Sequence, residues 1–217
     1  MRLLSSLLRT FFRLLYHQFA WSYDLVAAAV SLGRWQKWVD CALPYLEGRV
    51  LEIGPGPGHL QTSMRRAGLA VFGLEESRQM CRQAYRRLQK GGIKPHITRG
   101  YAQALPFPEN SFESVVATFP AEFLFESQTL AECWRVIRPG GRLVLLPMAW
   151  ITGRDLLDRL AAWLFRATGQ AGAIEAVLPS LYKRIQGAGF EVRHELAEVD
   201  GSRVLVILAG KPVKGNI

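Results

Sequence analysis

The sequence predicts an α/β fold built on a doubly wound, mostly parallel sheet. From Arg49 onward, short apolar runs rich in Val, Leu, Ile and Phe alternate with stretches of helical periodicity. Such alternation is typical of a parallel sheet covered by helices on both faces. The chain ends differently, because runs 190–199 and 202–211 flank a turn at Asp200 and Gly201 and predict a β-hairpin. We therefore expect the sheet to close with an antiparallel strand.

The expected elements follow in order, and each helix has a start or stop signal. The first forty or so residues have helical character. Parallel strands are expected at 49–53, 70–74, 113–119 and 141–146. The helices between them are expected at 59–68, 77–92 and 127–141. Ser77 is an N-cap candidate, and glycines or a Pro-Gly-Gly turn provide the stops.

Composition sets only broad limits on function. The 217 residues are 49% hydrophobic and 21% charged, with a formal charge of +9, as in an ordinary globular domain with a basic surface. That charge suits a nucleic acid, an anionic membrane or an acidic ligand without choosing among them. The three cysteines lie far apart and the histidines form no ligand-spaced cluster, so we expect no disulfide framework and no metal site. A reducing, cytoplasmic location is the simplest interpretation.

The N-terminal segment is apolar but does not have the pattern of a membrane span. Arg9 and Arg13 interrupt it, and the uninterrupted stretches are shorter than the roughly 20 residues that a span needs. It also lacks the continuous apolar region and cleavage site of a signal peptide. We expect neither a transmembrane helix nor a leader here.

A glycine-rich loop follows the first expected strand, in the stretch VLEIGPGPGHL at 50–60. Glycines at such a strand-to-helix turn let backbone N–H groups approach a ligand closely. A dinucleotide-binding G-x-G-x-x-G starting at Gly54 would need a glycine where His59 stands, and the Gly-Lys-Ser/Thr ending of a P-loop is absent. Glu52, just before the loop, would repel a pyrophosphate and would suit a ligand with a cationic group. A nicotinamide dehydrogenase is therefore disfavoured.

A second acidic residue is expected beside this loop. Glu75 ends the second expected strand, and ligands in such sheets bind at the carboxyl ends of the strands. A carboxylate there can accept both hydroxyls of a ribose. Taken alone, Glu75 and Glu76 would be solvated turn residues, but the pairing with the glycine loop favours a nucleoside site.

With these features in place, the chain resembles the class I S-adenosylmethionine-dependent methyltransferases that act on small molecules. VLEIGPGPG resembles the first motif of that family, and GLEES resembles the acidic end of its second strand. GYAQALPFPENSFESVVATF (100–119) resembles the adenine-contact loop and fourth strand, and AECWRVIRPGGRLVLL (131–146) resembles the helix, turn and fifth strand that follow. The match runs in order over roughly residues 45 to 147. It implies a seven-stranded, Rossmann-like methyltransferase fold.

The resemblance also implies a cofactor, S-adenosyl-L-methionine, and a site for it. Residues of the first motif would approach the methionine part and the ribose, Glu75 would take the ribose hydroxyls, and the residues after position 100 would hold the adenine. The implied site residues are Glu52, Gly54, Pro55, Gly56, Gly58, Glu75, Tyr101, Ala102, Gln103 and Phe119. The family usually has an acidic residue where Tyr101 stands, so stacking by Tyr101 or hydrogen bonding by Gln103 would have to replace that contact.

The expected chemistry is an in-line displacement that moves a methyl group from a sulfonium to an acceptor. It relies mainly on proximity and orientation, with a general base only if the acceptor must lose a proton. His17, His59 and Glu122 are candidates, but none is assigned a catalytic role. The segment TFPAEF (118–123) lacks the amide or carboxylate that enzymes methylating nucleobase amines carry there, so a nucleic-acid substrate is disfavoured.

Two regions outside the shared core are expected to cover a pocket for a small, apolar or lipid-like acceptor. We divide the chain into an N-terminal helical cap (1–44) and a core (45–217) with a helical insertion at about 148–178. Helix 2–15 and helix 153–169 each have an apolar face and arginines elsewhere. They either pack on the domain or rest on an anionic membrane. Tyr16, Tyr23 and Trp163 are candidate acceptor contacts, with core packing as the alternative.

Two other functions remain open at this point. An S-adenosylmethionine-binding regulatory or partner protein without transferase activity would need the same cofactor loop. An RNA methyltransferase would use the Arg78, Arg82 and Arg86 stripe of helix 77–92 to hold phosphates, although a charge run is more often a solvated face.

Overall fold

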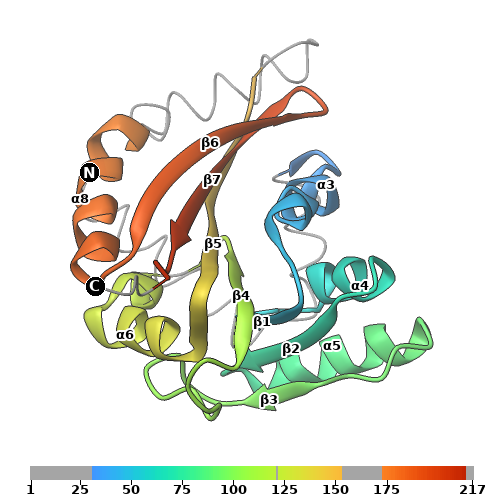
Figure 1. The fold of residues 1–217 in the computed structure, drawn as a ribbon. Coiled ribbons are helices and arrows are strands. Elements are labelled where there is room, and N and C mark those ends of the chain that lie inside the picture. Colours follow the sequence, from blue (N-terminus) through green and yellow to red (C-terminus); the bar gives the residue numbers. More distant parts are fainter. Residues whose placement is uncertain (1–30, 121, 153–172, 214–217) are drawn as a thin grey trace, which may run out of the picture.

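A seven-stranded sheet with the order β3-β2-β1-β4-β5-β7-β6 forms the centre of the molecule (Figure 1). The computed structural model describes residues 31–120, 122–152 and 173–213. The strands, in chain order, are β1 (Arg49–Ile53), β2 (Ala70–Glu75), β3 (Ile97–Arg99), β4 (Phe112–Thr118), β5 (Ile137–Ile151), β6 (Glu191–Val199) and β7 (Ser202–Gly210). Strands β1 to β5 are parallel, and β7 lies antiparallel between β5 and β6. The predicted doubly wound sheet with an antiparallel C-terminal hairpin is confirmed.

Helices cover both faces of this sheet (Figure 1). The helical elements are α3 (Trp35–Asp40), η2 (Leu43–Tyr45), α4 (His59–Arg66), α5 (Arg78–Lys90), η3 (Glu122–Phe125), α6 (Ser127–Val136) and α8 (Ala173–Gly187). Helices α3 and α4 pack on one hydrophobic cluster, which contains Val50, Val116 and Val144. Helices α6 and α8 pack on the other, which contains Leu51, Val115 and Leu145. Consecutive residues of one strand thus point into opposite clusters, which explains why these strands are apolar throughout.

Three details differ from the sequence prediction. Helix α6 ends at Val136 instead of continuing to the Pro-Gly-Gly turn, and Ile137 already pairs with Phe112 of β4. Strand β5 continues to Ile151 along β7, so the start of the expected insertion at about residue 148 falls inside a strand. Strand β3 and helix α8 were not predicted as separate elements.

Helix α3 is tied to the end of the sheet where the parallel strands finish. Lys37 forms an ion pair of 2.8 Å with Asp200 in the β6–β7 turn. Gln36 contacts Nδ1 of His59, the first residue of α4, at 3.0 Å. Since the ligand sites of open α/β sheets lie at the carboxyl ends of the strands, α3 stands beside the expected site. None of the helices in the described ranges is long and apolar enough to cross a bilayer.

Candidate functional site

The glycine loop lies at the carboxyl end of β1, where the strand order reverses between β1 and β4. Gly54, Gly56 and Gly58 all have positive φ angles, of 72°, 52° and 85°. A Cβ added at Gly54 or Gly56 would meet nothing within 4 Å, whereas one at Gly58 would lie 3.1 Å from Ala84 Cβ. The first two glycines therefore expose backbone to open space, and the third allows α4 to pack closely on α5.

Glu75 lies directly against this loop, as the sequence predicted. Its side chain is buried, and its Oε2 accepts a hydrogen bond of 3.1 Å from the N–H of Gly56. Its Oε1 accepts a bond of 2.8 Å from the N–H of Ser77, the N-cap of α5. An ionised carboxylate is an acceptor with about four lone-pair sites, a chemistry that suits ligand hydroxyl groups. The structure thus brings the two features that the sequence separates by about twenty residues into one site.

Glu52 is buried below the loop, 1% exposed. Its Oε2 accepts a hydrogen bond of 2.8 Å from Nε2 of Gln61 on α4. Burial raises the pKa of the Glu52 carboxyl to about 8, with a smaller contribution from Glu75, while the Gln61 hydrogen bond opposes the shift. Gln61 was not among the predicted site residues, because its position opposite Glu52 depends on how α4 docks on the sheet.

The next edge of the site is a hollow of about 260 Å³ lined by Glu76, Arg99, Gly100 and Tyr101. Tyr101 is 60% exposed and forms one wall. Of the other two residues implied for the adenine, Ala102 is buried in the core, and the side-chain amide of Gln103 donates to Glu126 Oε2 at 3.0 Å. Tyr101 is thus the residue of the three that faces the hollow.

Phe119 occupies a strained position at the carboxyl end of β4. Its φ is +48°, in the left-handed region that aromatic residues rarely adopt, and its N–H donates to Leu146 O at 2.7 Å. Its ring lies 4.6 Å from the ring of Trp35 and 6.2 Å from that of Trp38, both on α3. Non-glycine residues held in this way cluster at functional sites. The aromatic acceptor contacts predicted from the sequence, Tyr16, Tyr23 and Trp163, do not include these two tryptophans.

Comparison with known proteins agrees with this arrangement. Residues 51–145 match the model of a methyltransferase domain. The demethylmenaquinone methyltransferase of Thermus thermophilus is 32% identical over 139 residues, covering 61% of this chain and 63% of that protein. The demethylmenaquinone methyltransferase of Deinococcus radiodurans is 30% identical over 199 residues, covering 79% of this chain and 81% of that protein. The chain belongs to the class I S-adenosylmethionine-dependent methyltransferases. The crystal structure of a candidate S-adenosylmethionine-dependent methyltransferase from Methanococcus maripaludis has the same fold, with a TM-score of 0.67 and 14% identity over 93% of this chain and 96% of that one.

The site of this methyltransferase fits its cofactor, S-adenosyl-L-methionine. The space over Gly54 and Gly56 is open because neither residue has a Cβ. Their backbone is therefore accessible to a ligand. Glu75 lies beside the loop as an acceptor for ligand hydroxyl groups, and Glu52 below the loop suits a ligand with a cationic group, which would favour its ionised form. These properties were the basis of the sequence prediction.

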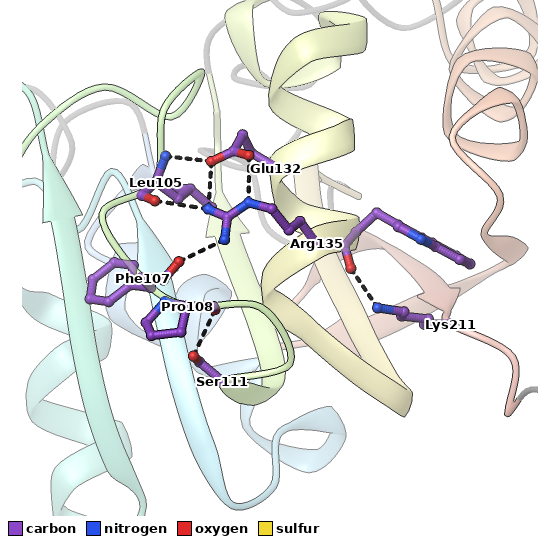
Figure 2. Close-up of polar contacts among 8 residues, drawn as sticks. Leu105, Phe107, Pro108, Ser111, Glu132, Arg135 and Lys211 are labelled. Atoms are coloured by element: carbon purple, nitrogen blue, oxygen red, sulfur yellow. Dashed lines mark hydrogen bonds and ion pairs between the residues drawn. The ribbon is translucent and has the colours of Figure 1, made fainter.

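A network from α6 fixes the loop that carries Tyr101 (Figure 2). The guanidinium of Arg135 donates to both carboxylate oxygens of Glu132, at 2.7 and 2.8 Å. It also donates to the carbonyls of Phe107 at 2.7 Å and Leu105 at 2.9 Å. Glu132 in turn accepts from the N–H of Leu105 at 2.7 Å, and the Arg135 hydrogen bonds lower the pKa of the Glu132 carboxyl. Arg135 and Glu132 thus satisfy loop backbone groups that have no strand or helix partner.

Replacing Arg135 with alanine should loosen this loop. Because the guanidinium is partly exposed, we expect the free energy of unfolding to fall by roughly 1–2 kcal/mol. Affinity for S-adenosylhomocysteine should fall as well, since Tyr101 would no longer be held in place. Arg203→Ala, which removes the exposed ion pair with Glu198, is the matched control and should change neither quantity by much. Calorimetry and thermal unfolding of both variants test this, and equal behaviour of the two would contradict a positioning role for Arg135.

The candidate bases and acceptor contacts can be placed only in part. Nδ1 of His59 is in contact with Gln36 and with the guanidinium of Arg87, at 3.0 and 3.2 Å, so this ring serves packing at the start of α4. His17, Tyr16, Tyr23 and Trp163 lie outside the described residues, as does the side chain of Glu122. The expected amphipathic helices 2–15 and 153–169 also lie outside them.

Proposed function

We propose that this methyltransferase methylates a small, lipid-like aromatic acceptor of the quinol class. The observation that carries the proposal is the aromatic wall formed by the half-buried rings of Trp35 and Phe119 at the carboxyl end of β4, with Trp38 buried behind them. Such a wall suits a flat apolar ring better than a nucleobase amine, for which the segment after β4 has no amide or carboxylate. Two similar proteins, from Thermus thermophilus and Deinococcus radiodurans, are demethylmenaquinone methyltransferases, which supports an acceptor of this type.

We assign the cofactor contacts according to the described geometry. The backbone of Gly54, Pro55 and Gly56 would lie along the methionine part, with Gly58 ending the loop and Glu52 providing negative charge below it. Glu75 would accept the ribose hydroxyls, and Tyr101 would stack on the adenine beside Ala102 and Gln103. Phe119 would stand next to the methyl group. These roles would account for the positions of Glu75 and the strained Phe119 at the carboxyl ends of β2 and β4, on either side of β1.

The chemistry asks the protein mainly for alignment and exclusion of water. The cofactor supplies an electrophilic methyl group on a positively charged sulfur. A ring carbon of the reduced acceptor forms a bond to that methyl group as the carbon–sulfur bond breaks, and the ring carbon then loses its proton to solvent. The aromatic wall would hold the ring in line with the breaking bond, which is the orientation effect that accelerates such displacements.

A methyl-release assay with a matched acceptor panel tests the proposal. Radiolabelled S-adenosylmethionine would be offered with a short-chain demethylmenaquinol, its oxidised quinone, a simple phenol, phosphatidylethanolamine and transfer RNA. We expect label in the quinol alone, because only the reduced ring is electron-rich enough at carbon. Label in the RNA, or no label in the quinol from a protein that still binds S-adenosylhomocysteine, would overturn the quinol assignment.

We further propose that the N-terminal helix expected at 2–15 touches the membrane periphery, where a lipid-like acceptor would be found. Its apolar face and its arginines have the pattern of an interfacial helix. Removing residues 1–15 should reduce liposome flotation while leaving the affinity for S-adenosylhomocysteine unchanged. Equal flotation of the two proteins would rule out this contact.

A further inference from the structure

The positive charge of the chain is concentrated at one edge of the sheet. Residues 76–101, which form α5, β3 and their connections, contain seven Lys and Arg but one acidic residue, Glu76. This segment therefore has a formal charge of +6, against +9 for all 217 residues. A field of this strength on one side of a small domain attracts anionic partners.

Three of these arginines form a row on α5. Arg78, Arg82 and Arg86 are exposed and line a shallow hollow of about 440 Å³ with Cys81 and Tyr85. Because they are four residues apart, they follow one side of the helix in steps of about 6 Å. We call Arg78, Arg82, Arg86 and Tyr85 the α5 basic face.

Within the described residues, the arginines of the α5 basic face lack the acidic partners that several other arginines have. Arg142, Arg193 and Arg203 each form an ion pair with a glutamate, at 2.6 to 3.1 Å. Within the ranges that the structure describes, the side chains of Arg78, Arg82 and Arg86 have no hydrogen bond or ion pair. Their charges are therefore available to an external anion at no cost in internal contacts.

The α5 basic face also adjoins the site. Helix α5 begins immediately after Ser77, whose N–H donates to Glu75. At the same end of β3, Arg99 and the exposed ring of Tyr101 line the hollow beside Glu76. A surface bound along α5 would thus reach the carboxyl edge of the sheet, where methyl transfer takes place.

We propose that the α5 basic face docks on a bilayer containing acidic phospholipids. The proposal rests on the lipid-like acceptor proposed above, since such an acceptor resides in a membrane. Unpaired arginines with exposed tyrosines at the flank suit the headgroup layer, in which cations meet lipid phosphates and tyrosine rings lie at the apolar boundary. A nucleic acid is disfavoured because Tyr85 is the single aromatic residue of α5, whereas base stacking along a strand uses several aromatic side chains interleaved with the basic ones.

Vesicle co-sedimentation of the full chain tests this. The variant Arg78→Gln/Arg82→Gln/Arg86→Gln removes three charges, and the variant Lys183→Gln/Arg193→Gln/Arg203→Gln removes three at the opposite side of the sheet, on α8, β6 and β7. With vesicles of phosphatidylcholine and phosphatidylglycerol, the first variant should bind about a hundredfold more weakly than the parent, because each basic residue near an anionic surface contributes about fivefold. The second should bind nearly as well as the parent. Added salt should weaken the parent far more than the first variant.

Three results would overturn the proposal. If the two triple variants lost vesicle binding equally, the net charge of the protein would attract the vesicles and no particular face would dock on them. Equal binding of the parent to pure phosphatidylcholine would mean that the arginines do not meet lipid phosphate. Tight, α5-dependent binding of single-stranded RNA with none to vesicles would assign the face to a nucleic acid. The quinol assignment is tested separately, because the first triple variant should still methylate a detergent-dispersed quinol at the parent's rate.

Discussion

Replacing Gly56 with valine is expected to abolish cofactor binding while leaving the fold in place. A valine side chain would occupy the open space over the loop, where a ligand must approach the backbone. It would also disfavour the φ of +52° and with it the hydrogen bond from Gly56 N–H to Glu75. We expect the affinity for S-adenosylhomocysteine, measured by calorimetry, to fall by about a hundredfold or more.

Gly68→Val separates the site effect from backbone strain. Gly68 also has a positive φ, of 82°, and an added Cβ would likewise meet nothing within 4 Å. It precedes β2, at the end of the strand opposite Glu75. Both variants should lose about 1–2 kcal/mol of unfolding free energy, since a β-branched residue is strained in this conformation. If Gly68→Val weakened cofactor binding as much as Gly56→Val, the loop would not be the cofactor site.

The central sheet could be predicted because its strands are buried on both faces. Strands β1 and β4 supply both hydrophobic clusters and therefore read as continuous apolar runs. Strand β3 has only three residues, of which Ile97 alone is buried, so it carries no such signal. Helix α8 contains Pro179, a residue that normally ends a helix. Strand β5 continues past Pro147 with a shift in its register against β7. Because proline is rare in the interior of a sheet, the sequence did not predict this continuation.

The parts of the site whose positions depend on spacing along the chain could be predicted from the sequence. The glycine loop and Glu75 terminate adjacent strands, and parallel pairing of β1 with β2 necessarily brings them together. Gln61 and Trp35 come from helices whose rotation and docking depend on the whole core. Their contacts with Glu52 and Phe119 are tertiary, and a local sequence pattern does not encode them.

Glu52→Gln is expected to change the dependence of stability on pH. Burial raises the pKa of Glu52 to about 8 in the folded protein, whereas an unfolded glutamate ionises near 4.5. Between these values the folded state keeps a proton that the unfolded state has lost, so the native protein loses stability as the pH rises from about 4.5 to about 8. Glutamine has the same shape, stays neutral and can still accept from Gln61. The variant should therefore be more stable than the parent at pH 8 to 9, by an amount on the order of a few kcal/mol.

Chemical denaturation of both proteins between pH 5 and pH 9 measures this difference. The parent's unfolding free energy should decline relative to that of the variant across the window and level off above it. Glu191→Gln, at an exposed position on β6, is the control and should follow the parent. Parallel curves for the parent and Glu52→Gln would mean that Glu52 is ionised in the folded protein throughout.

The same substitution separates the contribution of Glu52 to folding from its contribution to the ligand. A cationic amino group above the loop would favour the ionised carboxylate, so cofactor binding should release a proton from Glu52 at neutral pH. The parent's affinity for S-adenosylhomocysteine should then rise between pH 6 and pH 8, and calorimetry in buffers of different ionisation enthalpy should detect the released proton. Glu52→Gln should bind more weakly at pH 8, with neither the rise nor the proton. Glu52 lowers the stability of the folded protein at neutral pH, and a neutral residue of the same size would stabilise the fold better. An acid at this position is therefore expected only if its ionised form contributes to binding the cationic cofactor.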